Sequence, residues 1–87
     1  MSDDYEKRVI FLTFAAVGKT YECGVGSHMT FRRILSNMKD LAASDLKNRY
    51  RISGREHIFE QRSCAECDPD VSVRSLNVHN GMHFIIF

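Results

Sequence analysis

The sequence lacks a long hydrophobic run, a dominant charge and an even number of cysteines. Its apolar stretch VIFLTFAAV (9–17) is too short to cross a bilayer, and the acidic-then-basic start MSDDYEKR is unlike a signal peptide. Three cysteines cannot all pair within one chain, so a reducing compartment is the default. We therefore expect a cytoplasmic protein that does not insert directly into a membrane.

Net charge and chain length further restrict the class of protein. The 12 basic and 11 acidic residues leave a net charge of +1, which argues against a nucleic-acid binder or a polybasic membrane-docking protein. A chain of 87 residues with 44% hydrophobic residues has the size and composition of one globular domain. We expect a loose polar tail over residues 1–7 and a folded domain over residues 8–87.

The first half of the chain predicts a hairpin followed by a helix. Residues 8–16 and 20–25 alternate as strands do, around a turn at 17–19 in which Gly18 can take a positive φ. The alternation places Ile10, Leu12 and Phe14 on one side, and Val9, Phe11 and Thr13 on the other. Residues 30–46 then follow a helical period from an N-cap at Thr30. The expected apolar stripe is Phe31, Ile34, Leu35, Met38, Leu41, Ala42 and Leu46.

The second half predicts three shorter strands. RYRIS (49–53) and HIFE (57–60) flank a turn at Gly54, a polar loop covers 61–72, and MHFIIF (82–87) forms the last strand after the Asn80-Gly81 turn. The order β-β-α-β-β-β with a single amphipathic helix indicates an α+β domain, in which a mixed sheet packs on that helix. We expect the last strand to lie beside the first.

This order and the ending SVRSLNVHNGMHFIIF resemble the ubiquitin-like β-grasp fold. A buried apolar turn precedes an Asn-Gly turn and a final strand in that fold, and Leu76, Val78, Asn80, Gly81 and Phe84 occupy those places here. RISGREHIF likewise looks like the third strand, glycine turn and fourth strand of ubiquitin-like domains. The resemblance covers roughly residues 8–87 and implies a fold more than a function.

Within this fold, length and ending are most similar to the YukD-type bacterial proteins linked to type VII secretion. That resemblance implies a non-conjugating, non-enzymatic accessory or regulatory factor that binds secretion-machinery proteins. No set of nucleophile, base and orienting residue can be recognised in the sequence, so we expect no catalytic residue, metal or cofactor.

The alternation of side chains along the strands predicts a binding surface. If Tyr50 and Ile52 point inward, Arg49 and Arg51 point outward. If Phe84 and Ile86 point inward, His83, Ile85 and Phe87 point outward on the neighbouring strand. Apolar residues beside arginine are typical of protein interfaces, so these five residues form our candidate partner-binding site. The alternatives are that the arginines form a solvated face, and that Ile85 and Phe87 are covered within the chain or in a homodimer.

Two other functions stay open as alternatives. A covalent modifier or sulfur carrier of this fold needs a flexible Gly-Gly tail, whereas this sequence stops at Phe87, so that function would require a truncated chain. A small zinc or redox protein could use Cys64 and Cys67, although a structural zinc site needs four ligands and nearby acids would raise thiol pKa values. We expect these two thiols to be free in a loop, Cys23 to pack in the core, and the P-loop-like TFAAVGKT (13–20) to be a hairpin turn.

Overall fold

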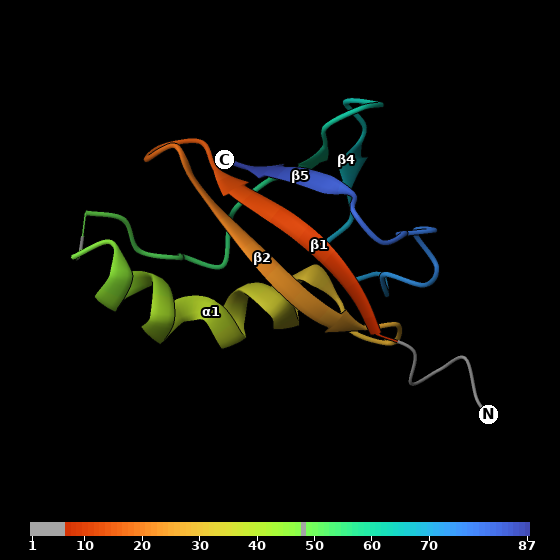
Figure 1. The fold of residues 1–87 in the computed structure, drawn as a ribbon, viewed down its shortest axis with the longest axis horizontal. Coiled ribbons are helices and arrows are strands. Elements are labelled where there is room, and N and C mark those ends of the chain that lie inside the picture. Colours follow the sequence, from red (N-terminus) through yellow and green to blue (C-terminus); the bar gives the residue numbers. More distant parts are fainter. Residues whose placement is uncertain (1–6, 48) are drawn as a thin grey trace.

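The computed structural model describes residues 7–47 and 49–87, in which a five-stranded sheet lies against one helix (Figure 1). The predicted tail at 1–7 falls almost wholly outside these residues. The elements are β1 (Lys7–Phe14), β2 (Lys19–Gly26), α1 (Phe31–Asp45), β3 (Ile58–Glu60), β4 (Glu66–Cys67) and β5 (His83–Ile86). The predicted order β-β-α-β-β-β is therefore confirmed.

The sheet is mixed, with the strand order β2-β1-β5-β3-β4. β5 runs parallel to β1 and antiparallel to β3, so the last strand lies beside the first as expected. β1 and β2 pair over their full length, and the turn between them contains Gly18 at a φ of 66°. The P-loop-like segment is thus the end of a strand, a hairpin turn and the start of the next strand.

Helix α1 covers one face of the sheet. It begins after Thr30, whose side chain accepts a hydrogen bond from the Arg33 amide at 3.2 Å, as expected for an N-cap. Arg32, which stands unfavourably in the first turn, donates from Nε to Asp70 at 2.5 Å. One member of the predicted stripe is wrong, because Leu41 is 59% exposed. At 100° per residue Leu41 lies on the flank of the stripe rather than at its centre.

The predicted strand at 49–53 is also wrong. These residues alternate as expected, with Ile52 buried and Tyr50 packed against the core, but they pair with no strand among the described residues. The Glu56 carboxylate accepts the Ser53 and Gly54 amides at 2.6 and 2.8 Å and holds this segment in a local turn. The third strand is therefore β3, and the fourth, β4, lies in the segment that was predicted to be a loop.

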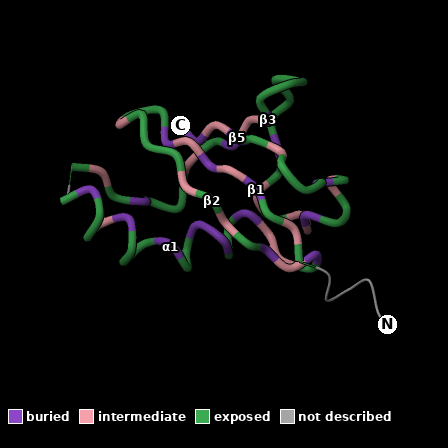
Figure 2. Tube along the Cα trace, viewed as in Figure 1, coloured by how far each residue is buried: buried purple, intermediate pink, exposed green. Residues whose placement is uncertain are grey.

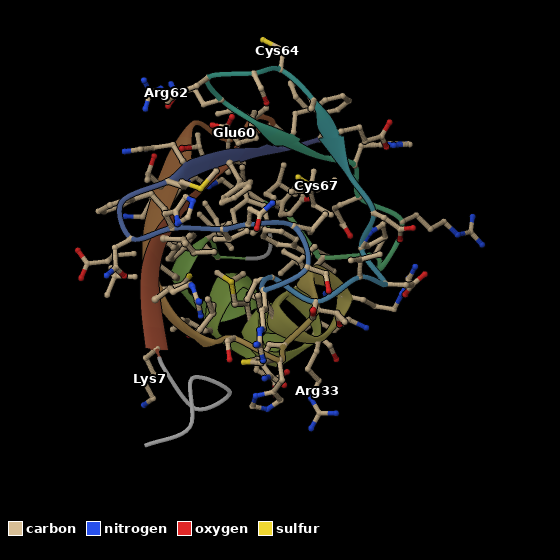
Figure 3. The ribbon with its side chains drawn as sticks, turned by 90° about the vertical axis from the view of Figure 1, so that its right-hand side faces the viewer. Lys7, Arg33, Glu60, Arg62, Cys64 and Cys67 are labelled. Carbon is tan, nitrogen blue, oxygen red and sulfur yellow. The ribbon has the colours of Figure 1, made fainter. Side chains whose placement is uncertain are left out.

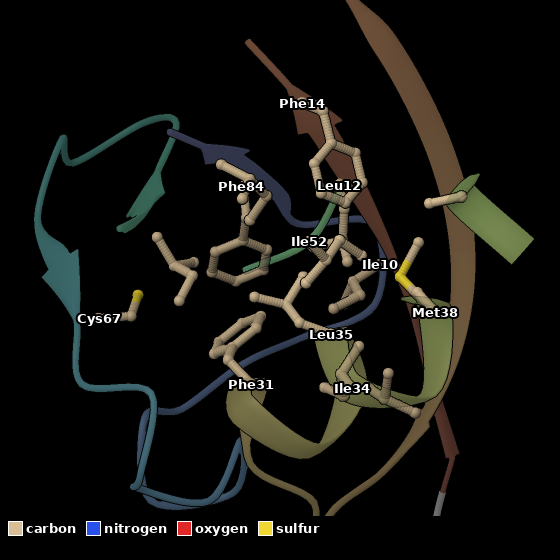
Figure 4. Packing of buried hydrophobic residues seen from close by; sticks show 14 of the residues in the cluster. Ile10, Leu12, Phe14, Phe31, Ile34, Leu35, Met38, Ile52, Cys67 and Phe84 are labelled. Carbon is tan, nitrogen blue, oxygen red and sulfur yellow. The ribbon is translucent and has the colours of Figure 1, made fainter. Parts of the chain in front are cut away.

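The core lies between α1 and the inner face of the sheet (Figures 2 and 4). Phe31 of α1 packs on Phe84 of β5, with ring centroids 4.8 Å apart. In the turn before β5, Val78 is buried as predicted, Leu76 is half-buried against the core, and Gly81 takes a φ of 84°. This packing aims the odd-numbered residues of β5 away from the helix.

Candidate protein-binding surface

The sheet face opposite α1 carries apolar side chains from three neighbouring strands. Strand register places Phe59 of β3 directly beside Ile85 of β5, and the Phe59 and Phe87 rings meet edge to face at 5.6 Å. On the other side of β5, Phe11 lies opposite His83, and their rings stack at 4.6 Å. We call Phe11, Phe59, Ile85 and Phe87 the outer apolar patch.

Alternation along β5 explains why this patch faces outward. Phe84 is 1% exposed against α1, whereas Phe87 is 62% exposed on the opposite face. Phe87 is nevertheless fixed in place, because its backbone exchanges two hydrogen bonds with His57 at 2.9 and 3.0 Å. Because this backbone is already fixed, no backbone conformational entropy is lost here when a partner covers the side chain.

A shallow hollow lies at one end of the patch. Phe59, Ile85 and Phe87 line it on the sheet, and the β3–β4 turn forms its rim with Glu60, Gln61 and Cys64. That turn is held by the Glu60 carboxylate, which accepts the amides of Arg62 and Ser63 at 2.8 and 2.9 Å. These two hydrogen bonds hold the pKa of Glu60 below its ordinary value. The hollow could therefore receive an apolar side chain beside an ordered rim.

The structure brings together three of the five predicted site residues. His83, Ile85 and Phe87 share the outer face, as strand alternation predicted. Arg49 and Arg51 do not join them, because the segment that carries them is not a strand of the sheet. Arg49 donates from Nε to the Leu46 carbonyl at the end of α1, and Arg51 shares a hollow with Lys39, Asp40 and Ala43 of that helix. The neighbours of β5 are β1 and β3 instead.

Sequence reasoning missed Phe11 and Phe59 as members of the site. The alternation of residues 8–16 did place Phe11 on the side opposite the core, which was a usable signal. Nothing local indicated that Phe59 would lie beside Ile85, because that contact depends on a pairing between segments 26 residues apart in the chain.

The two cysteines of the Cys-x-x-Cys motif point to different environments (Figure 3). Cys64 is exposed, whereas Cys67 of β4 pairs with Ile58 of β3 and is buried on the inner face of the sheet. Burial raises the pKa of the Cys67 thiol, and it also raises that of Cys23, whose Sγ contacts the Met38 sulfur at 3.8 Å. Within the described residues no three His, Cys, Asp or Glu side chains group in a way that could hold a metal.

No helix formed by residues 7–47 and 49–87 is long and apolar enough to span a bilayer. No family model and no curated protein matches the sequence.

Solved structures match the fold closely. The ubiquitin-like domain of an Arabidopsis thaliana protein has a TM-score of 0.66 at 12% identity, over 94% of this chain and 77% of that one. The ubiquitin of Caldiarchaeum subterraneum has a TM-score of 0.67 at 14% identity, over 93% and 91%. A chain of the MycP5-free ESX-5 inner membrane complex has a TM-score of 0.70 at 14% identity, over 93% of this chain but 20% of that one. The chain therefore has the ubiquitin-like β-grasp fold.

Proposed function

We propose that this chain is a non-catalytic protein-binding module whose outer apolar patch receives another protein. The patch carries this proposal, because four large apolar side chains lie on the face that α1 does not cover, and three of them, Phe59, Ile85 and Phe87, lie side by side. A fold that packs one helix on one sheet face needs no aromatic residues on the other face. Aromatic residues that form a fixed, exposed cluster are the usual anchors of a protein interface.

We further propose that the partner belongs to a bacterial type VII secretion machine, in which the chain acts in the cytoplasm as an accessory or regulatory factor. The resemblance of length and pattern to YukD-type proteins supports this assignment. So does the fold that the chain shares with part of the ESX-5 inner membrane complex, although at 14% identity the likeness extends to the fold alone.

Binding to purified secretion components tests both levels of the proposal. The full chain would be titrated against the secretion ATPase and the cytoplasmic part of the membrane component from the same genome, by calorimetry. We expect one of them to bind the wild type, and the double variant Ile85→Asp/Phe87→Asp to bind at least about 30-fold more weakly, because charges replace anchors at the centre of the interface.

A matched control separates lost binding from lost folding. The double variant Ser36→Asp/Asn37→Asp adds the same two charges to the exposed side of α1, away from the patch, and should bind like the wild type. Both variants should melt cooperatively, since neither charge enters the core. Unchanged binding by the double variant would overturn the role of the outer apolar patch. Binding of the wild type to neither component would overturn the secretion assignment.

A further inference from the structure

A second hollow lies at the end of the sheet where β5 begins. The β3–β4 turn forms one of its walls, and the turn at Asn80 and Gly81 forms the other (Figure 1). Its volume is about 600 Å³, so a large side chain with a polar end group could enter it. Five of the side chains that line it carry N–H groups, namely Gln61, Arg62, His79, Asn80 and His83.

Asn80 presents a donor whose orientation is fixed. Its Oδ1 accepts the Val9 amide at 2.7 Å, and only the oxygen of the side-chain amide can do so. The turn itself is held to β1, because the Gly81 amide donates to the Val9 carbonyl at 2.7 Å. The Asn80 Nδ2 group therefore faces away from the Val9 amide, and within residues 7–47 and 49–87 it donates to no other group.

The two histidines also keep their ring nitrogens available. The His83 ring stacks on the Phe11 ring at 4.6 Å with an interplanar angle of 14°, a contact that uses the ring face and leaves the nitrogens at its edge. His79 begins the turn, and its carbonyl accepts the Met82 amide at 3.2 Å. Neither imidazole has a hydrogen-bond partner in the described part of the chain, and each carries at least one N–H donor.

Arg62 is the only described residue of the lining with a permanent positive charge, and Glu60 is the only acid. The Glu60 carboxylate is already engaged, because each of its oxygens accepts one backbone amide, from Arg62 at 2.8 Å and from Ser63 at 2.9 Å. The Arg62 guanidinium forms no hydrogen-bonded ion pair among the residues described. Its parallel N–H groups are thus available to an oxyanion.

The number of donors indicates a phosphoryl group. Arg62 and Glu60 cancel in formal charge, so recognition depends on oriented N–H groups more than on net charge. A carboxylate offers two oxygens, which the guanidinium alone can satisfy. A phosphoryl group has three terminal oxygens and a charge of about −1.5 to −2, and it can therefore also use Asn80 and an imidazole.

The second hollow adjoins the outer apolar patch. Gln61 borders both hollows, and His83 lines the second hollow while its ring lies on Phe11 of the patch. A protein that covers the patch would therefore extend over this hollow as well. We propose that the second hollow binds a phosphoryl group on a side chain of that partner protein. The site follows from the donors alone, and only the identity of the carrier rests on the proposed function.

Inorganic phosphate is the smallest probe of the site. It would be titrated into the ¹⁵N-labelled full chain at low ionic strength, with chloride at equal ionic strength as the reference. We expect saturable shifts of the Asn80 side-chain amide and the Arg62 Nε–H, because both gain an acceptor. The corresponding signals of Asn77 and Arg55, which do not line the hollow, should not move.

A pair of asparagine variants isolates the Asn80 donor. Asn80→Asp keeps an oxygen for the Val9 amide but replaces Nδ2 with an acceptor, and should weaken phosphate binding at least about tenfold. Asn77→Asp adds the same charge to an exposed residue that does not line the hollow, and should weaken binding less than about twofold. Both variants should keep the wild-type pattern of amide signals, so a difference in binding reports the lost donor.

A pair of arginine variants tests the guanidinium. Arg62→Gln leaves the backbone amide that Glu60 accepts, and should weaken phosphate binding at least about tenfold because the charge and the paired N–H groups are lost. Arg55→Gln removes the same charge from an exposed residue outside the hollow, and should weaken binding less than about twofold.

Phosphopeptides identify the carrier. Blocked peptides would place a leucine about one to four residues from a phosphoserine, beside otherwise identical peptides that contain serine. We expect at least one phosphopeptide to bind at least about tenfold more tightly than inorganic phosphate, because its leucine also reaches the outer apolar patch. This gain should disappear in Ile85→Ser/Phe87→Ser, whereas inorganic phosphate should bind that variant like the wild type.

The possible failures give different results. An absence of saturable shifts at Arg62 and Asn80 at tens of millimolar phosphate would overturn the site. Equal effects of Asn80→Asp and Asn77→Asp would overturn it too, because only general charge would then matter. Phosphopeptides that bind no more tightly than phosphate would overturn the partner protein as the carrier. A failure of the calorimetric test would count against the outer apolar patch alone, since the phosphate titration does not involve that patch.

Discussion

The two faces of β5 carry similar apolar residues, but those on one face are buried and those on the other are partly or mostly exposed. Phe84 and Ile86 are each 1% exposed against α1, while Ile85 is half-buried and Phe87 is 62% exposed on the other face. The side chains are equally apolar, so hydrophobicity does not distinguish them. The difference is that one face has a helix over it. The inner pair stabilises the fold, and we propose that the outer pair binds a partner.

Truncation of the two phenylalanines should give the largest contrast between the faces. Phe84→Ala removes a ring packed on Phe31 and should lower the free energy of unfolding by about 3–5 kcal/mol. Phe87→Ala removes a ring that is mostly in solvent and should lower it by less than about 1 kcal/mol. Urea denaturation followed by circular dichroism measures both.

Phe84→Leu keeps the comparison measurable if the alanine variant is largely unfolded, because it retains most of the buried volume. Equal losses for Phe84→Ala and Phe87→Ala would show that the outer apolar patch supports the fold and would remove the reason to assign it to a partner.

The same contrast shows which features of the fold could be predicted from the sequence. Alternation within MHFIIF placed Phe84 and Ile86 inside and Ile85 and Phe87 outside, because a strand's two faces are a local property. The helix stripe and the Asn80-Gly81 turn were predictable for the same reason. Which strands are neighbours is not local, so the place of Phe59 beside Ile85 could not be read from the sequence.

The prediction that placed Arg49 and Arg51 on the outer sheet face failed for a different reason. Arg49 and Arg51 lie in a segment that alternates like a strand, yet Glu56 satisfies the backbone amides of Ser53 and Gly54 within a local turn. A side chain that bonds nearby backbone competes with the ladder of a sheet, and here the local bonds prevail. The alternation correctly predicted that Ile52 points inward, but the segment that carries it pairs with no strand among the described residues.

Cysteine chemistry should show a smaller contrast between an exposed and a buried position. Cys64 is exposed on the rim of the hollow, whereas Cys67 is buried and its thiol pKa is raised by that burial. We expect Cys64 to react with a disulfide reagent at least about tenfold faster than Cys67, because only the exposed thiolate is accessible. Absorbance of the released thiol at pH 8, measured in a Cys23→Ser background so that only these two thiols react, gives both rates.

Two variants assign the reaction phases. Cys64→Ser should lose the fast phase, and Cys67→Ser should keep it. In urea the remaining thiols should react alike. Fast reaction of Cys67 in the folded chain would mean that the β3–β4 turn opens readily, so that the rim of the hollow is not fixed as we describe it.

Glu60 is a charged residue on the otherwise apolar inner side of the sheet. The contribution of its charge to stability should be the smallest of the three effects predicted here. It follows Ile58 on the inward side of β3, and its carboxylate accepts the amides of Arg62 and Ser63, which hold its pKa below the ordinary value. A carboxyl whose pKa is lower in the folded chain contributes stability above its ordinary pKa, and that contribution is lost as the pH falls through the lowered value.

The urea midpoint of the wild type should therefore exceed that of Glu60→Gln at pH 7, and the difference should be smaller at pH 4, below the ordinary pKa of a glutamate carboxyl. Glutamine keeps the shape and one acceptor, so the comparison isolates the charge. Glu66→Gln, on the outer face of β4, is the matched control for a carboxyl that bonds to His57 instead of to backbone amides. A difference for Glu60→Gln that is unchanged between the two pH values would assign the effect to packing under the sheet, and the turn that borders the hollow would then be held by shape rather than by charge.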